Sequence, residues 1–172
     1  MEPETVYEEK IPFYFGLVTA AILAASAVLM LVLLVLQLGG DPIGTRPAPD
    51  WFYLAMFIFL SAVSIFVLNF RKLNITATSQ SLTIAFGMVK RKIPWGDIEQ
   101  FYRDESSAFA YGGWGIRISR VGGKWRLVYN VAGCPGIVVG LRTGRFREFV
   151  FSTRNPEQVL DIISRHTGAA RK

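Results

Sequence analysis

The chain has 172 residues, half of them hydrophobic, which leaves room for one soluble domain and a short membrane-spanning segment. Residues 1–70 carry two basic and six acidic side chains, whereas residues 71–172 carry seventeen basic and seven acidic ones. A single cysteine, Cys134, excludes an intramolecular disulfide and a zinc site built from several thiolates. The uneven charge is typical of a protein that contacts a membrane surface or a nucleic acid, or of an orientation signal.

The first predicted element is an apolar helix at residues 13–38, inside a run without charged residues from Ile11 to Gly40. About 20 apolar residues suffice to cross a bilayer core, so this helix is long enough. A secretory signal peptide has a basic start and a shorter apolar run, whereas the residues before this helix are mostly acidic. We therefore expect residues 1–12 to form a separate N-terminal segment that precedes a membrane span.

A second charge-free run at residues 51–70 predicts a second span, and a turn rich in proline and glycine joins the two. Residues 13–70 are thus expected to form a transmembrane hairpin in the cell membrane. Lys10, Arg71 and Lys72 flank the hairpin on one side, whereas the connecting turn contains only Arg46. The positive-inside rule then predicts that both termini are cytoplasmic.

Neither predicted span contains a charged residue, which argues against transport through the hairpin itself. Gly16, Ala20 and Ala24 repeat at a spacing of four, as small residues do where helices pack closely. Two interpretations stay open: the two spans pack against each other, or the small residues mediate oligomerisation.

After the hairpin the pattern changes to short alternating runs typical of β-strands, separated by turn residues. Two of these runs form a predicted hairpin around Ser79 and Gln80. The seven predicted strands are Leu73–Thr78, Ser81–Phe86, Ile98–Arg103, Trp114–Arg120, Lys124–Tyr129, Ile137–Arg142 and Arg145–Phe151. Asn155, Pro156 and Glu157 then predict a helix start, and an amphipathic helix follows. We expect residues 71–168 to be a mostly β domain and residues 169–172 to be a tail.

Seven antiparallel strands in a partly open barrel or sandwich, capped by a C-terminal helix, is the plan of the pleckstrin-homology (PH) superfold. Several motifs extend this comparison: Ser81–Phe101 with its Ile93-Pro94-Trp95 step, Tyr111–Arg117, Tyr129-Asn130, Gly133, Gly136, Leu141–Arg145 and Phe151–Glu157. In these the chain resembles small, uncharacterised prokaryotic membrane proteins that have two spans followed by a bacterial PH-like domain. The resemblance implies a fold and a topology, and it supplies no catalytic residues.

The basic residues of the β domain predict a surface that faces anionic lipid, since each nearby Lys or Arg contributes about 1 kcal/mol of attraction. In an up-and-down meander, every second turn returns to the membrane side. This reasoning selects Arg71, Lys72, Lys90, Arg91, Lys92, Arg120 and Lys124. The alternative is a cationic surface that is simply solvated.

The turn between Asp104 and Gly113 is expected at the end of the domain that points away from the membrane. Phe109, Tyr111 and Trp114 flank its glycine pair, and exposed aromatic rings often anchor protein partners. These three residues are therefore the predicted partner surface. The alternative is that the rings only pack against the rim of the barrel.

The sequence offers no convincing catalytic constellation, metal site or cofactor-binding motif. The turn Ala77–Gln80 lacks the Lys and Arg that phosphoinositide-binding PH domains carry there, and the GxxG pairs do not stand between a strand and a helix. Nucleic acid is not expected as a partner. We expect a non-enzymatic, membrane-anchored binding or scaffold module that contacts an unidentified membrane protein or itself. The alternative is an accessory or regulatory subunit of a membrane enzyme or transporter.

Overall fold

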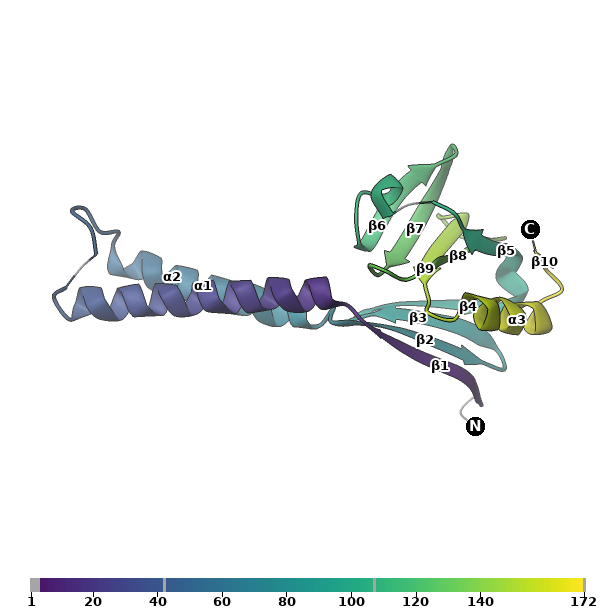
Figure 1. Ribbon diagram of the computed structural model, residues 1–172, viewed down its shortest axis with the longest axis horizontal. Helices are drawn as coiled ribbons and strands as arrows, with labels where there is room; N and C mark the ends of the chain where they lie inside the picture. The colour runs from purple at the N-terminus through teal and green to yellow at the C-terminus, as the bar shows by residue number, and fades with distance from the viewer. Residues whose placement is uncertain (1–3, 42, 107, 172) are drawn as a thin grey trace. The chain divides into compact units, whose positions relative to one another are not determined.

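The computed structural model describes residues 4–41, 43–106 and 108–171 (Figure 1). The chain forms two compact units. One is a helical unit, Tyr14–Arg71, and the other is a β domain assembled from the two flanking segments, Met1–Phe13 and Lys72–Lys172. The helical unit is thus an insertion of 58 residues into the β domain.

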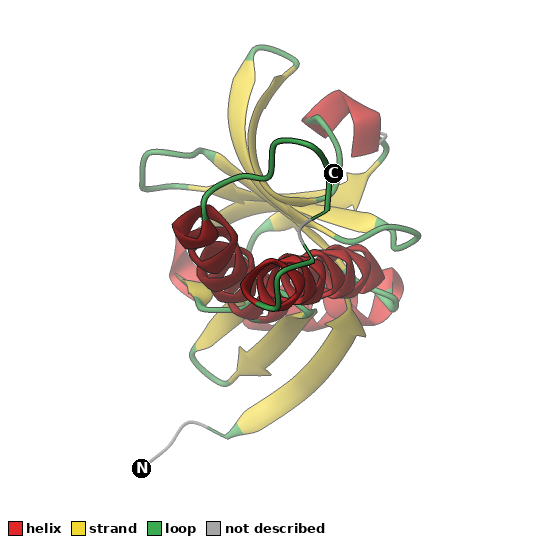
Figure 2. Cartoon of the chain, turned by 90° about the vertical axis from the view of Figure 1, so that its left-hand side faces the viewer, coloured by secondary structure: helices red, strands yellow, loops and turns green. Residues whose placement is uncertain are grey.

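The helical unit consists of α1 (Tyr14–Leu38) and α2 (Asp50–Leu68), which lie side by side (Figures 1 and 2). At 1.5 Å per residue their 25 and 19 residues extend about 37 and 28 Å, close to the thickness of a bilayer core. Only 11% and 6% of the residues in their most apolar windows are buried, so neither is the core helix of a soluble domain. The prediction of two helices long and apolar enough to cross a membrane is confirmed.

Small residues form the contact between the two helices. Gly16, Ala20 and Ala27 are buried on α1, and Ser64 of α2 donates a hydrogen bond of 2.9 Å to the carbonyl oxygen of Ala20. Ala24, which shares the predicted four-residue spacing, is exposed. Packing between α1 and α2 therefore accounts for the first part of the small-residue pattern.

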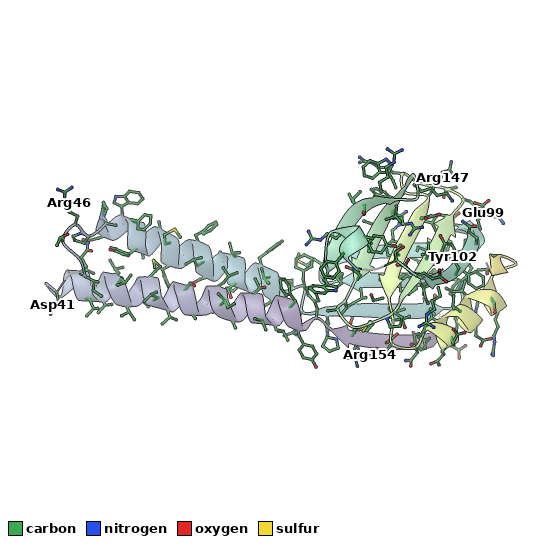
Figure 3. The ribbon with its side chains drawn as sticks, turned by 45° about the horizontal axis from the view of Figure 1, so that its top comes forward. Asp41, Arg46, Glu99, Tyr102, Arg147 and Arg154 are labelled. Atoms are coloured by element: carbon green, nitrogen blue, oxygen red, sulfur yellow. The ribbon has the colours of Figure 1, made fainter. Side chains whose placement is uncertain are left out.

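The connection between α1 and α2 is closed by a side chain. Gln37 donates from Nε2 to the carbonyl oxygen of Ala48 at 3.0 Å and to the carboxylate of Asp50. Asp41 and Arg46 lie at this end of the helical unit (Figure 3). The charged residues of this region lie in the connection or at the start of α2, and the middle of both helices has none, as the sequence indicates.

The first sheet of the β domain has the order β1-β2-β3-β4, and all its neighbours are antiparallel. Its strands are β1 (Thr5–Pro12), β2 (Lys72–Thr78), β3 (Ser81–Phe86) and β4 (Val89–Pro94). The sequence predicted β2 and β3 but neither of the edge strands. Residues 5–12 belong to the β domain rather than to a separate segment, and Lys90, Arg91 and Lys92 lie in β4 rather than in a turn.

Glu9 explains how a strand rich in charge joins the core. It faces inward beside Ile75 and is 9% exposed. Its carboxylate accepts hydrogen bonds from Thr153 Oγ1 at 2.6 Å and from the backbone N–H of Arg154 at 2.8 Å. The hydroxyl of Tyr7 donates to the same carboxylate at 2.9 Å. These bonds fasten β1 to the segment that precedes the C-terminal helix.

The second sheet has the order β10-β5-β8-β9-β7-β6. Its strands are β5 (Ile98–Asp104), β6 (Gly115–Val121), β7 (Lys124–Asn130), β8 (Gly136–Leu141), β9 (Glu148–Ser152) and β10 (Ala170–Arg171). The pairs β7–β9 and β5–β10 are parallel, which departs from the expected all-antiparallel arrangement. The chain described between Lys72 and Ser152 contains eight strands where seven were expected, and the expected C-terminal tail contributes β10.

Aromatic rings join the two sheets into one core. Phe86 of β3 packs edge-on against Phe13 at 5.2 Å and against Tyr129 of β7 at 6.4 Å between ring centroids. Tyr129 in turn packs against Phe149, and Phe149 stacks with Phe151. Alternate residues of the second sheet therefore face the first sheet.

The C-terminal helix α3 (Pro156–His166) covers part of this core with an apolar stripe. Val159, Leu160 and Ile163 are each 1% exposed or less, as the amphipathic pattern predicts. Pro156 begins the helix, but the side chain of Asn155 makes no capping hydrogen bond. His166 stacks on Trp95 of the 3-10 turn η1 (Trp95–Asp97) at 4.9 Å, which secures the last turn of α3.

One end of the first sheet carries both connections to the helical unit. Pro12, the last residue of β1, pairs with Lys72, the first residue of β2. Phe86 and Val89, which border the turn between β3 and β4, lie at the same end of the ladder. We call this end, formed by Pro12, Lys72, Phe86 and Val89, the attachment end.

The Glu9→Ala variant is expected to lower the free energy of unfolding by about 1–3 kcal/mol, because it removes the acceptor of the buried Thr153 hydroxyl and of the partly buried Arg154 N–H. Thermal unfolding of the detergent-solubilised chain measures this. Glu8→Ala is the matched control, since Glu8 is the exposed neighbour and its ion pair with Lys10 lies on the surface. Equal losses in both variants would contradict the assigned role of Glu9.

Candidate functional site

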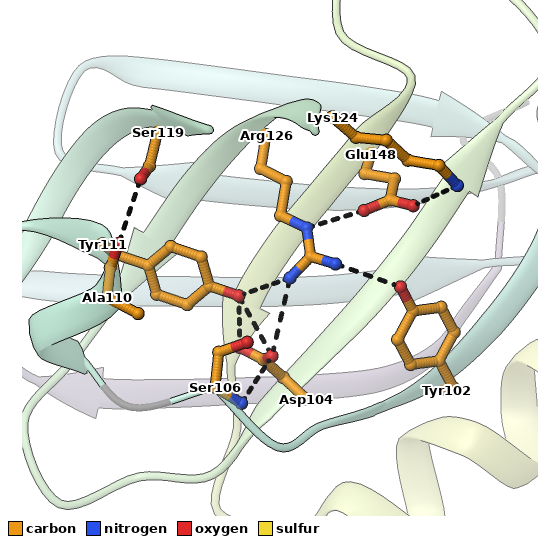
Figure 4. Close-up of polar contacts among 9 residues, drawn as sticks. All are labelled: Tyr102, Asp104, Ser106, Ala110, Tyr111, Ser119, Lys124, Arg126 and Glu148. Carbon is orange, nitrogen blue, oxygen red and sulfur yellow. Dashed lines mark hydrogen bonds and ion pairs between the residues drawn. The ribbon is translucent and has the colours of Figure 1, made fainter. Parts of the chain in front are cut away.

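The outer face of the second sheet, which points away from the first sheet, holds a buried polar cluster. Arg126 and Val128 alternate with core-facing residues on β7, as Glu148 and Val150 do on β9. The segment from Asp104 to Trp114 includes the 3-10 turn η2 (Ala108–Tyr111) and lies over this face (Figure 4). We call this segment, apart from the undescribed Ser107, the covering loop.

Arg126 is the centre of the cluster (Figure 4). Its Nε donates to Glu148 Oε2 at 2.6 Å, and its Nη1 donates to the hydroxyl of Tyr111 at 2.8 Å. Its Nη2 donates to the hydroxyl of Tyr102 at 3.3 Å. Glu148 also binds Lys124 Nζ through Oε1 at 3.0 Å. A single guanidinium thereby joins strands β5, β7 and β9 to the covering loop.

Asp104 completes the cluster from the end of β5. The Tyr111 hydroxyl lies 2.9 and 3.0 Å from its two carboxylate oxygens, and the backbone N–H of Ser106 donates to it at 3.1 Å. Arg126 Nη1 lies 3.9 Å from Asp104 Oδ1. Two carboxylates thus face two cations, and the charges of the cluster balance. Its donors and acceptors satisfy one another, so its chemistry is that of positioning the covering loop.

Burial and charge act in opposite directions on the ionisable groups of the cluster. Burial alone would raise the pKa of Glu148, but hydrogen bonds and charges from Lys124 and Arg126 outweigh it and hold that pKa below its usual value. Burial likewise disfavours the charged form of Arg126, yet Tyr111 and Glu148 raise its pKa. Both ion-pair partners therefore stay charged in the folded protein.

Tyr111 secures the covering loop by packing as well as by hydrogen bonds. Its ring is 4% exposed and belongs to a small apolar cluster with Val128, Val138 and Val150. Burial, together with Asp104, raises the pKa of its hydroxyl, which stays protonated and donates to that carboxylate. The structure thus assigns Tyr111 to the interior rather than to an exposed partner surface.

A cavity of about 310 Å³ opens beside this cluster, between the covering loop and the connection from β7 to β8. Its lining combines polar groups, among them Asp104 and Asn130, with the half-buried Cys134. Asn130 donates to the carbonyl oxygen of Gly113 at 3.0 Å, while its buried Oδ1 has no hydrogen-bond partner within the described part of the chain. The cavity is mixed in character, and Asp104 is the one charged side chain among its described lining residues.

The other two residues of the predicted partner surface differ from Tyr111. Phe109 is 83% exposed, and Trp114 is half-buried with its ring centroid 6.3 Å from that of Phe109. The covering loop therefore brings the two rings together at its surface and sends Tyr111 into the interior.

Contacts across the domain place the covering loop near the attachment end. Gly113 is bonded to Asn130, and the neighbouring Tyr129 packs on Phe86, which itself contacts Phe13. The sequence predicted this loop at the opposite end, because it assumed a continuous meander. In the structure residues 90–92 belong to strand β4, which adds one reversal of the chain, so every later turn lies at the opposite end from the one predicted, while β5 to β9 still alternate in direction.

The seven residues of the predicted lipid-facing surface do not form one group. Arg71, Lys72, Lys90 and Lys92 are exposed, whereas Arg91 lies on the inner face of β4 with a buried Nε. Arg120 and Lys124 flank the turn at the far end of β7 from Tyr129, and Lys124 is paired with Glu148. Three of the seven, Arg71, Lys72 and Lys90, lie at or beside the attachment end.

Sequence reasoning did not select Arg126, Glu148 or Asp104. A signal was present, because Arg126 and Glu148 each stand two positions before a buried valine, Val128 and Val150, on the same face of their strand. A charge in such a position needs a buried partner. The pairing itself depends on the parallel register of Arg126 with Glu148, which local pattern does not reveal.

No cluster of three or more His, Cys, Asp or Glu residues suited to a metal ion occurs among the residues that the structure describes. Comparisons with protein-family models, with curated proteins and with solved structures found no match. The reasoning about function therefore starts from this chain's own geometry.

Replacing Arg126 by methionine is expected to cost about 3–5 kcal/mol of stability, because Glu148 and Asp104 would remain buried without their cation. Arg117→Met on the neighbouring strand β6 removes an exposed arginine and is expected to change stability by no more than about 0.5 kcal/mol. Chemical unfolding of the solubilised chain compares the two. Similar losses would show that Arg126 is not the centre of the cluster.

The lowered pKa of Glu148 predicts a pH dependence of stability. Its ionised form is favoured by folding, so its contribution is complete above the usual glutamate pKa of about 4.3 and is lost as pH falls through the folded-state pKa. The gap in melting temperature between the wild type and Glu148→Gln should therefore be widest near neutral pH and should narrow on acidification. A gap that does not change with pH would contradict this assignment.

Proposed function

We propose that this protein is a non-enzymatic, membrane-anchored binding or scaffold module in which the helical hairpin holds the β domain at a bilayer. The observation that carries the proposal is the pairing of β1 with β2. One residue, Phe13, separates β1 from α1, and three residues separate α2 from β2. Both ends of the hairpin are thus joined to neighbouring strands of one sheet.

The surface of the helices supports the membrane part of the proposal. Large apolar side chains such as Ile22, Ile58 and Ile65 are each about 60% exposed along α1 and α2. Exposure of this much apolar surface to water is unfavourable, whereas the apolar core of a bilayer accommodates it. Because β1 and β2 pair with each other, a hairpin that spans the membrane must enter and leave on the same side.

Charge supports a cytoplasmic orientation and contact with anionic lipid. Arg71, Lys72 and Lys90 are exposed at or beside the attachment end, while the connection between the helices has only Arg46. By the positive-inside rule the β domain is cytoplasmic. Each such cation near an anionic surface contributes about 1 kcal/mol of attraction.

The end of the second sheet opposite the attachment end offers a surface that fits a protein partner. Ile118 and Trp125 are 57% and 55% exposed, and they line a hollow of about 280 Å³ with Arg145 and Phe146. The guanidinium of Arg145 lies over the Phe146 ring at 5.6 Å. Residues 106–147 contain no acidic residue, so this surface is suited to an acidic partner and disfavours its own copy.

The resemblance to bacterial PH-like domains remains part of the proposal. Two sheets followed by an amphipathic C-terminal helix agree with that plan. The parallel pairing of β7 with β9 and the inserted hairpin after β1 are departures from a simple seven-stranded meander.

The alternative, an accessory subunit of a membrane enzyme or transporter, is favoured by one feature of the helical unit. A hollow of about 220 Å³ on the helix pair is lined by small and apolar residues, among them Ala24, Ala27 and Ser61. Small residues allow another helix to approach closely within a bilayer. The two functions differ in whether partners bind the hairpin or the β domain.

Single-cysteine labelling tests the proposed topology. In a Cys134→Ser background, Thr45→Cys lies in the connection between the helices and Thr5→Cys lies at the start of β1, both at exposed positions. A membrane-impermeant maleimide applied to spheroplasts should label Thr45→Cys at once and Thr5→Cys only after permeabilisation. Labelling of both positions from the same side would refute a hairpin that spans the membrane.

Photo-crosslinking separates the two proposed partner surfaces. A photoreactive residue at Trp125 should yield a crosslinked protein in native membranes, whereas the same residue at Ala24 should not. Mass spectrometry of the product distinguishes a foreign partner from a second copy of this chain. Crosslinks from Ala24 alone would favour the accessory-subunit function.

A further inference from the structure

Exposed apolar side chains occur at two places near the attachment end. Phe109 of η2 is 83% exposed, and Met88 and Val89 at the turn between β3 and β4 are 71% and 41% exposed. Exposed apolar residues are common one at a time, but these stand beside the point where the chain passes into apolar helices. The grouping of these exposed apolar residues near the attachment end therefore suggests a common contact.

The covering loop holds Phe109 outward by a defined construction. Tyr111, two residues later, is anchored by Asp104 and Arg126. The hydroxyl of Ser119 donates to the carbonyl oxygen of Ala110 at 3.2 Å, which fixes η2 against β6. The two residues that follow Phe109 are thus bonded to this face of the sheet, which fixes the backbone next to its outward ring.

Glycine makes the return of this loop to β6 feasible. Gly112 and Gly113 have φ of 79° and 106°, in the left-handed region that favours glycine. The carbonyl oxygen of Gly113 then accepts the bond from Asn130. Figure 1 shows the short helix of this loop beside β6, the edge strand of the second sheet.

The charge around these apolar residues suits a membrane surface. Arg71, Lys72 and Lys90 are exposed near the attachment end, and Arg117 is exposed on β6 beside the covering loop. The covering loop has one exposed acid, Glu105. Aromatic side chains among cations are typical of segments that sit at the headgroup level.

A bilayer fits this surface better than a second copy or a protein partner. The chain continues without a linker from Phe13 into α1, so the bilayer that holds the hairpin is present at high effective concentration. A second copy would bring like charges together. The apolar residues also lie in two separate turns, which suits a planar surface more than the pocket that a protein anchor needs.

We propose that Phe109 and the turn Met88–Val89 insert into the headgroup region of the bilayer that holds α1 and α2, with Arg71, Lys72, Lys90 and Arg117 on anionic headgroups. The β domain is then seated on the membrane at its attachment end rather than held only by its two connections. This inference rests on the proposed membrane anchoring. It replaces the protein-binding role that the sequence predicted for Phe109 with lipid contact.

Site-directed spin labelling of the full chain in vesicles tests the inference. In a Cys134→Ser background, nitroxide labels at Phe109→Cys and Met88→Cys are compared with a label at Ile118→Cys, which is exposed in the middle of β6. A label at Val28→Cys, exposed on α1, reports on the anchor itself. Vesicles contain phosphatidylcholine alone or with phosphatidylglycerol, and accessibility to oxygen and to a water-soluble nickel chelate reports the depth of each label.

The expected result is that the labels at 109 and 88 are several-fold more accessible to oxygen than to the nickel chelate, and more so with phosphatidylglycerol. The label at 118 should show the opposite preference. Replacing Arg71, Lys72, Lys90 and Arg117 together with glutamine should remove the dependence on phosphatidylglycerol. Circular dichroism of each variant confirms that the β domain is folded.

Two failures are distinguishable. A lipid-exposed label at 28 together with water-exposed labels at 109 and 88 would overturn the seating of the β domain and leave the anchor intact. A water-exposed label at 28 would overturn the proposed anchoring and with it this inference. Motional immobilisation at 109 without a rise in oxygen accessibility would indicate a protein contact, which also overturns the inference.

Discussion

The pairing of β1 with β2 across the inserted hairpin is the constraint on which the rest of the structure depends. Two strands that are neighbours in one sheet are separated in sequence by the 58 residues of the helical unit. Closing so long a loop costs chain entropy, which grows slowly with length. Contact between α1 and α2, including the Ser64 bond to Ala20, shortens the effective loop and reduces this cost. Folding of the hairpin and closure of the first sheet therefore support each other.

The buried carboxylate of Glu9 links this first constraint to the C-terminal part of the domain. β1 is an edge strand, and edge strands are prone to fray or to pair with other chains. Glu9 ties β1 to Thr153 and Arg154, just before α3 begins. The hydrogen bonds are charge-assisted and therefore stronger than neutral ones. The N-terminal and C-terminal ends of the β domain are in this way bound to each other over 144 residues of sequence.

The sequence was informative where structure follows from local pattern. The two apolar helices, the strands β2, β3 and β5 to β9, and the C-terminal helix have clear periodicities, and the structure contains them. β1 was missed because its inward face carries Tyr7 and Glu9 beside one apolar residue, Ile11. β4 was missed because three consecutive cations resemble a turn, although Arg91 faces the core side of the sheet. In both strands tertiary partners, which one sequence does not show, override the local preference.

The residues of the candidate site also divide into those that local sequence pattern points to and those that depend on tertiary contacts. Composition pointed to the aromatic residues of the covering loop, but only the register of β7 with β9 brings Arg126 to Glu148, and this pair is what draws Tyr111 inward. Because the sequence argument missed strand β4, its count of alternating turns also placed the loop at the wrong end of the domain.

The buried cluster around Arg126 determines how the covering loop presents the exposed Phe109. A surface loop that presents Phe109 to its surroundings gains nothing if the loop collapses onto its own sheet, as apolar side chains tend to do in water. Arg126 and Asp104 prevent this by binding Tyr111, because any inward movement of the loop would expose or separate charges that are costly to leave unpaired. The rigidity comes from electrostatics inside the domain, and in the proposed membrane contact the affinity comes from the Phe109 ring outside. A rigid outward ring near the attachment end pays less conformational entropy on entering a bilayer interface than a flexible one would.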